Sequence, residues 1–302
     1  MTTYFPPHNK QLLPRVSDSW SFVYVETTHI ERDAHALVVS NEQGQLRLPS
    51  AQFVTILAGP GTTITHAATT LLAERGCSMV WCGEAAVRFY ASALPETQTT
   101  ALLESQAQAW AFPQARAVVA RRMYRMRFPD DPVDERTSIE QLRGREGSQM
   151  RTLYREIAQR YGVEWQGRSY DENDGLASEL LQQAISVANS CLYGVCQAAI
   201  VSIGMSSGLG FVHHGHQRSF VFDIADLYKA SVSLPIAFAT VAESDANIAQ
   251  RVRRACRDAF YTQRVLERIV PDLLGLFAVP VPGVRYIDMQ KDDLRDQILG
   301  SE

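Results

Sequence analysis

The spacing of apolar residues changes from a strand-like to a helix-like period partway along the chain. Between residues 20 and 61, short apolar runs are separated by polar or glycine-containing turns, which is typical of β-strands. These runs are WSFVYVE, ALVVS, QLRLP and FVTILAG. A helix is predicted next, over THAATTLLAERG, with Thr65 as the N-cap and Gly76 as the stop. CSMVWCG and AVRFYAS then return to strand character.

Beyond the segment LPETQTT, which we interpret as a linker, the apolar residues recur with a helical period. Four long helical stretches follow: ALLESQAQAWAFPQARAVVARRMYRMRF, TSIEQLRGREGSQMRTLYREIAQRYG, ASELLQQAISVANSCLYGVCQAAIVSIG and SDANIAQRVRRACRDAFYTQRVLERIV. The second opens with Thr137 and Glu140 at capping-box spacing. We therefore predict an α+β chain. Its parts are a β-rich domain (1–93), a linker (94–100), an α-helical domain (101–280) and a C-terminal tail (281–302).

Composition predicts a globular protein with no membrane segment. Apolar residues make up 46% of the 302 residues and charged residues 21%, which argues against disorder. Residues 189–212 come nearest to a membrane span, but Asn189, Gln197 and several serines and glycines interrupt them. The first residues contain no apolar stretch of the kind found in secretory signals. We expect a cytoplasmic protein that does not contact a membrane.

The cysteines and the charges exclude few classes of function. Five cysteines are an odd number and lack the two-residue gap of zinc ribbons, so we expect reduced core residues in a reducing compartment. The formal net charge of −4 does not favour nucleic-acid binding. Nearly all the positive charge is arginine, since lysine occurs only at positions 10, 229 and 291. Arginine supplies a planar fork that suits phosphate.

An acidic residue stands in the middle of an apolar helix face. Glu146 shares the face of the second helical stretch with Leu142 and Met150, at spacings of four residues. Burying an unpaired carboxylate costs several kcal/mol or more. Two interpretations remain open: an ion pair with Arg143 or with an arginine from another helix, and a metal ligand or general base.

The stretch GFVHHGHQRSFVFDIADLYK, over residues 210–229, concentrates ionisable residues among apolar ones. Asp223 and Asp226 are three residues apart and share a face if this segment is helical. They could equally form a helix cap without chemistry. The three histidines of HHGH are a weak metal signal by themselves. Together with Glu146, however, two aspartates and a histidine suit Mg²⁺ or Mn²⁺ in phosphodiester chemistry.

The fourth helical stretch carries an arginine face with Arg253, Arg257, Arg264 and Arg268. Such a face is often simply solvated, but it could also follow a phosphate backbone. Tyr170 and Tyr193 could stack on unpaired bases, or they could be ordinary packed tyrosines.

Several blocks of the chain together resemble one family. The blocks are PGTTITHAA, VWCGEAAVRFYA, MRFPDDPVDERTSIEQLRGREGSQMR, SCLYGV and GFVHHGHQRSFVFDIADLYK, and they occur in the family's order. They are similar to the CRISPR-associated integrase of spacer acquisition, "Cas one", in its subtype I-E form. The resemblance covers about residues 12–275.

The resemblance implies an N-terminal β-sandwich-like domain followed by a C-terminal all-α domain. It implies a homodimer, two of which flank a dimer of the small partner "Cas two" in a heterohexamer. Such a complex binds double-stranded prespacer DNA and splays its ends into single-stranded 3′ ends. It then joins the 3′-hydroxyls to CRISPR repeat DNA by metal-dependent transesterification. The resemblance also implies that isolated members of the family act as metal-dependent DNA endonucleases.

The resemblance also assigns residues. It implies that Glu146 of QLRGREG, His213 of GFVH and Asp226 of DIAD hold the divalent ion, Mg²⁺ or Mn²⁺. It implies that Asp223 is needed for activity, as a carboxylate behind these ligands or at a second ion. The positions that fall in DNA-contacting regions of the family are Arg88, Arg143, Tyr170, Tyr193, Arg253 and Arg257.

The leading hypothesis is a metal-dependent DNA integrase and endonuclease. Two hypotheses of other classes stay open. A non-catalytic DNA-bridging scaffold would use the arginine faces and leave Asp223 and Asp226 as a helix cap. A metal-dependent nucleotide phosphohydrolase would use the His/Asp cluster on small phosphoesters.

Overall fold

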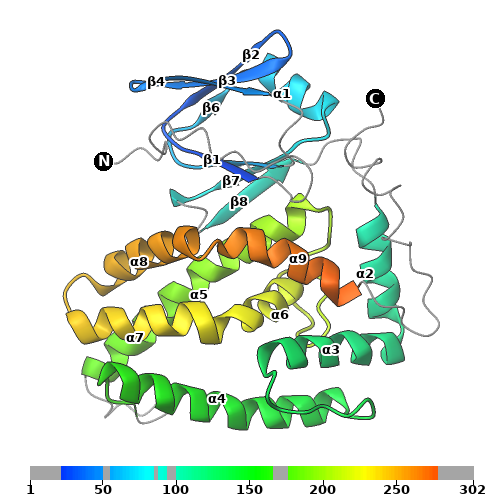
Figure 1. Cartoon of the computed structure of the whole chain (residues 1–302), viewed down its shortest axis with the longest axis vertical. Coiled ribbons are helices and arrows are strands. Elements are labelled where there is room, and N and C mark those ends of the chain that lie inside the picture. The colour runs from blue at the N-terminus through cyan, green and yellow to red at the C-terminus, as the bar shows by residue number, and fades with distance from the viewer. Residues whose placement is uncertain (1–21, 50–54, 85–87, 94–99, 166–175, 278–302) are drawn as a thin grey trace.

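The computed structural model describes residues 22–49, 55–84, 88–93, 100–165 and 176–277. Two four-stranded sheets form the N-terminal part (Figure 1). One has the order β1 (Phe22–Val25), β5 (Thr55–Ala58), β7 (Ser78–Cys82) and β8 (Phe89–Ala93). Its first three strands are parallel, and β8 is antiparallel to β7. The other has the order β4 (Gly44–Pro49), β3 (Ala36–Asn41), β2 (His29–Asp33) and β6 (Thr63–Ile64).

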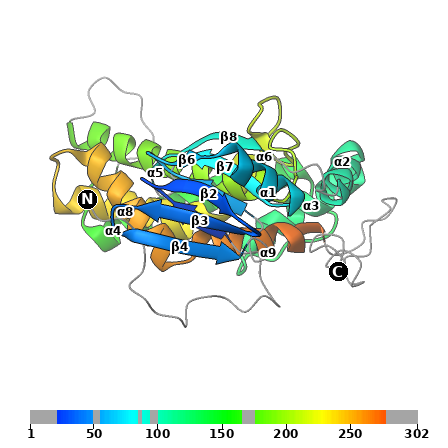
Figure 2. The same cartoon turned by 90° about the horizontal axis from the view of Figure 1, so that it is seen from above.

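The two sheets and the helix α1 (His66–Glu74) enclose one hydrophobic core. Ile30 and Leu37 enter it from one sheet, Ile56 and Met79 from the other, and Leu71 from α1. Thr65 caps α1 by accepting a hydrogen bond from the amide of Ala68, as predicted. The predicted β-sandwich-like part followed by helices is confirmed, and seen from above the strands β2, β3 and β4 overlie the helical part (Figure 2).

The sheet that contains β5 is buried on both of its faces. Every residue of β5 is buried, because alternate residues face different cores. Ile56 and Ala58 face the sandwich, whereas Leu57 packs with Val80 in the core of the helical part. This sheet therefore joins the two parts of the molecule through packed side chains.

The remaining helices form the second part of the protein. They are α2 (Ala101–Ala111), α3 (Pro113–Arg127), α4 (Ile139–Tyr161), α5 (Leu176–Ser202), α6 (Ser219–Tyr228), α7 (Leu234–Glu243), α8 (Ile248–Thr262) and α9 (Val265–Phe277), with a π-helical turn at Lys229–Ser233 between α6 and α7. The apolar helix α5 is central and packs against α6, α7, α8 and α9. Helices α6 to α9 thus pack around the buried helix α5.

Several predicted boundaries were wrong. The first helical stretch is two helices, because Phe112 is extended and Pro113 starts α3. The fourth is also two, since Arg264 has a positive φ of 50° between α8 and α9. The capping box of α4 uses Ser138 and Gln141, one residue later than predicted.

Two stretches within the described residues, Glu179–Ser202 and Ser219–Glu243, are long and apolar enough to cross a membrane by length and composition. The apolar windows in them are 67% and 50% buried inside the protein, which is typical of core helices. All five cysteines are free and buried, as predicted. The predicted tail, and the predicted linker apart from Thr100, lie outside the described residues.

Candidate functional site

A pocket lies where α3, α4 and α6 meet. Its apolar wall includes Met123, Leu142 and Leu227, and its polar wall comprises Arg127, Arg143, Glu146, Asp223 and Asp226. Helices α3 and α4 are held together by a small cluster of buried side chains, Ala120, Tyr124 and Leu142, and Val212 of the segment before α6 packs against it. The predicted acidic residues therefore come to one place although 80 residues of sequence separate Glu146 from Asp226.

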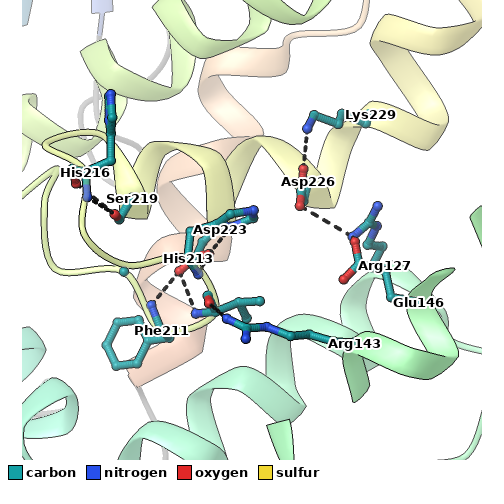
Figure 3. Close-up of polar contacts among 12 residues, drawn as sticks. Arg127, Arg143, Glu146, Phe211, His213, His216, Ser219, Asp223, Asp226 and Lys229 are labelled. Atoms are coloured by element: carbon teal, nitrogen blue, oxygen red, sulfur yellow. Dashed lines mark hydrogen bonds and ion pairs between the residues drawn. The ribbon is translucent and has the colours of Figure 1, made fainter. Parts of the chain in front are cut away.

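Glu146 and Asp226 face the same nitrogen atom. Nη1 of Arg127 lies 2.5 Å from Oε1 of Glu146 and 3.6 Å from Oδ2 of Asp226 (Figure 3). The Arg127 side chain is only 8% exposed, and those of Asp226 and Glu146 are 13% and 26% exposed. Glu146 is thus paired with an arginine from another helix, which was one of the two interpretations left open by the sequence.

Asp223 anchors the segment that carries His213. Helix α6 begins at Ser219, so Asp223 lies within the helix and the helix-cap interpretation is wrong. Its fully buried carboxylate accepts hydrogen bonds from three successive backbone amides, those of Phe211, Val212 and His213. These amides converge on one carboxylate, which holds the segment in a single conformation.

The ring of His213 is oriented by the same carboxylate. Nδ1 lies 2.7 Å from Oδ1 of Asp223, so the carboxylate accepts the Nδ1 hydrogen, and in the neutral ring the lone pair is on Nε2. The hydrogen bond with Asp223 holds the pKa of His213 above its ordinary value, although partial burial opposes this shift. A carboxylate behind a histidine is a common arrangement for a metal-binding imidazole.

The carbonyl side of this segment is held by two arginines. Nε of Arg116 donates to the carbonyl of Phe211 at 2.9 Å, and Arg143 donates to the carbonyl of Val212. Arg143 itself is exposed and lines the pocket. In the backbone that precedes His213, the amides are therefore bonded to Asp223 and the carbonyls to the two arginines.

Lys229 completes the charge balance of the site. Its Nζ lies 2.6 Å from Oδ1 of Asp226 and 5.3 Å from the centre of the Tyr193 ring. Burial acts to lower the pKa of Lys229, but the nearby Asp226 raises it above its ordinary value. Two carboxylates thus face two cations, Arg127 and Lys229.

The predicted DNA-contacting residues fall into two places. Arg143 and Tyr193 lie at the site, where Tyr193 packs edge-on against Phe222 at 5.0 Å. Arg257 instead joins α8 to the loop after β7, through Glu84 at 2.7 Å. Arg253 lies one turn earlier on α8, and Arg88 is exposed just before β8. Tyr170 lies outside the described residues.

The carboxylate pair fits a divalent ion, because two oxygens from different helices already converge on one cation. Nδ1 of His213 is bonded to Asp223, so Nε2 is the ring nitrogen that an ion would use. In the described part of the chain, no three His, Cys, Asp or Glu side chains lie close enough together to hold an ion. The three-ligand metal site stays a prediction.

Sequence reasoning missed several residues that shape the site. They are Gln106, Arg116, Arg127 and Lys229. Arg127 has a recognisable signal, because two acids on apolar helix faces require nearby cations. The sequence alone does not say which of the many arginines supplies that charge.

The fold defines a class of protein in which a β-sheet part is joined to a helical part that carries the pocket. A casposase bound to its integration product shares the fold, with a TM-score of 0.59 and 12% identity, over 86% of this chain and 96% of that one. A crystal structure of a TtCas1–DNA complex is more similar, with a TM-score of 0.80 and 45% identity, over 90% of this chain and 100% of that one.

Sequence similarity to one family extends over most of the chain. The family described as CRISPR associated protein Cas1 matches residues 22–130 and 130–257. CRISPR-associated endonuclease Cas1 2 of Thermus thermophilus is 46% identical over 269 residues, which are 89% of this chain and 82% of that protein. CRISPR-associated endonuclease Cas1 of Escherichia coli K12 is 38% identical over 257 residues, which are 85% of this chain and 84% of that protein. This chain belongs to the Cas1 family.

Proposed function

We propose that this chain is a metal-dependent DNA integrase and endonuclease that inserts prespacer DNA into a CRISPR repeat. The observation that carries the proposal is the convergence of Glu146 and Asp226 on one cationic atom, beside the histidine segment held by Asp223. Membership of the Cas1 family supports it.

In this proposal Glu146, Asp226 and Nε2 of His213 hold Mg²⁺ or Mn²⁺. The ion supplies charge stabilisation to the phosphate and to the attacking and leaving oxygens. An oxygen-rich ligand set with one imidazole suits either metal.

The chain's own residues position the reactants. Asp223 keeps the His213 ring in one tautomer, and the exposed Arg143 contributes a planar donor to the lining of the pocket. In the reaction, a prespacer 3′-oxygen forms a bond to a repeat phosphorus while the repeat's own 3′-oxygen leaves. The attacking hydroxyl loses its proton and the leaving oxygen gains one. Alignment of the two strands then supplies much of the rate.

The wider assembly is part of the same proposal. We assign the chain to subtype I-E, as a cytoplasmic homodimer, two copies of which flank a dimer of the partner Cas two. We propose that the residue 1–93 and 101–280 regions act as its two domains. The residues proposed to contact DNA are Arg88, Arg143, Tyr170, Tyr193, Arg253 and Arg257.

The test is strand joining by variants of the two convergent carboxylates. Labelled duplex is incubated with a supercoiled repeat plasmid, Cas two and Mn²⁺ or Mg²⁺. Glu146→Gln and Asp226→Asn are expected to lower the yield of joined product about 100-fold or more, because each removes a charged ion ligand. The matched control is Glu156→Gln, an exposed position on the same helix, which should join DNA at the wild-type rate. Wild-type joining by either site variant contradicts the proposal.

One observation favours a second candidate, the DNA-bridging scaffold. Arg127 and Lys229 already neutralise both carboxylates, as they would in a purely structural network. A scaffold binds DNA equally with EDTA or Mn²⁺ and yields no joined product in the same assay. A nucleotide phosphohydrolase would instead turn over small phosphoesters without any duplex end.

A further inference from the structure

Arg127 is held in an unusual way for a buried arginine. It presents a single nitrogen, Nη1, to both Glu146 and Asp226, rather than a two-pronged pair to one carboxylate. Its Nη2 donates to the sulfur of Met150 at 2.9 Å, and sulfur is a weak acceptor. Its Nε is buried without a hydrogen-bond partner in the described residues. The guanidinium therefore lacks the full set of partners that a permanent structural ion pair requires.

The two carboxylates explain why the guanidinium is there. Glu146 and Asp226 point at one spot, and their negative charges repel each other unless a cation lies between them (Figure 3). A divalent ion bound by the same oxygens would lie about 2.1 Å from each. The ion and Nη1 of Arg127 cannot share those oxygens, because the two cations would repel at such a distance.

We infer that Arg127 is a stand-in cation, which occupies the ion's position in the metal-free protein and leaves it when a divalent ion binds. The inference rests on the proposed ion site of Glu146 and Asp226. Arg127 thereby keeps the acids together before the ion arrives and lowers the apparent affinity for it. Lys229 does not compete in this way, because it contacts Oδ1 of Asp226 whereas Arg127 faces Oδ2.

The experiment measures Mn²⁺ binding rather than activity. Full-length protein is stripped with EDTA, dialysed and titrated with MnCl₂ alone by calorimetry. Arg127→Gln is expected to bind Mn²⁺ about tenfold more tightly than wild type, because the competing charge is gone. Arg125→Gln is the matched control: it removes the same charge from an exposed position of α3 and should leave the dissociation constant unchanged. An unchanged or weaker affinity in Arg127→Gln overturns the inference.

Thermal unfolding provides a second readout that does not depend on calorimetry. In EDTA, Arg127→Gln should melt at a lower temperature than wild type, since the two acids lose their counter-ion. Saturating Mn²⁺ should then raise its melting temperature by more than it raises that of wild type. Equal Mn²⁺-induced shifts in the two proteins also overturn the inference.

Titration of Glu146→Gln separates this inference from the proposed function. If Glu146→Gln abolishes Mn²⁺ binding but Arg127→Gln binds no more tightly than wild type, the ion site stands and the stand-in role of Arg127 fails. If Glu146→Gln binds Mn²⁺ as tightly as wild type, the ion site of the proposed function fails, and the inference fails with it.

Discussion

At the scale of single residues, the most constrained side chain of the site is Asp223. It is entirely buried, yet its charge is matched by three backbone amides and the His213 ring. Hydrogen bonds to a charged group contribute about 1.5–3 kcal/mol each, which is enough to offset the burial of a carboxylate. Asp223 therefore acts on the site through the conformation of its neighbours.

Asp223→Asn tests this role. The amide replaces one acceptor oxygen with an NH₂ group, which faces donors, so we expect the free energy of unfolding to fall by about 3 kcal/mol. Urea denaturation measures the change, with the exposed Asp245→Asn as the control. A loss below about 1 kcal/mol would show that the amide network contributes little.

At this scale the sequence predicted which acidic side chains come together better than it predicted their partners. The apolar stripe around Glu146 indicated a carboxylate that needed a cation, and the structure supplies Arg127. The spacing of Asp223 and Asp226 predicted a shared helix face, but it gave no indication that one aspartate turns to a loop and the other to an arginine. Such choices depend on packing between segments distant in sequence.

At the scale of elements, the loop between α5 and α6 is fixed from helix α2. Gln106 is fully buried, and its Nε2 donates to the carbonyls of Ser206 and Leu209 at 2.9 and 3.2 Å. Its Oε1 accepts from the amide of Ser206 at 2.8 Å. One side chain thus satisfies three backbone groups of the loop that leads to His213, which lets an irregular segment lie next to the core.

Gln106→Leu should unfold more easily than wild type. Leucine fills a similar volume but leaves two carbonyls and one amide unsatisfied, so we expect a loss of about 3 kcal/mol or more in unfolding free energy. The measurement is urea denaturation followed by circular dichroism. Gln159→Leu, at an exposed position of α4, should change the free energy by less than about 0.5 kcal/mol. Similar effects of the two substitutions would refute the role of Gln106.

Whether a segment is a helix or a strand was easier to predict from the sequence than the point at which one helix ends and the next begins. Amphipathic period alone indicates α4 and α5, because each has a sustained apolar face. Strand β2 (His29–Asp33) was missed, since only Ile30 of its five residues is buried and the rest is polar. The break between α2 and α3 depends on the backbone of Phe112, which apolar period does not report.

At the scale of the whole molecule, the sheet containing β5 and β7 belongs to two cores at once. Leu57 and Val80 pack with the helices, whereas Ile56 and Met79 pack inside the sandwich. The β-rich and helical parts therefore share a layer of close-packed side chains, which explains why every residue of β5 is buried. The fold class was predictable from the change of period, but this shared layer was not.

The site also belongs to the whole molecule, because α3, α4 and α6 each supply part of it. We propose that Glu146, Asp226 and His213 share one divalent ion. The sharpest test is a crystal of the protein soaked in Mn²⁺ and measured at the manganese absorption edge. We expect one anomalous peak about 2.0–2.3 Å from an oxygen of each acid and from Nε2 of His213, with Arg127 moved away. A peak elsewhere, or Arg127 still between the two carboxylates at saturating Mn²⁺, would contradict it.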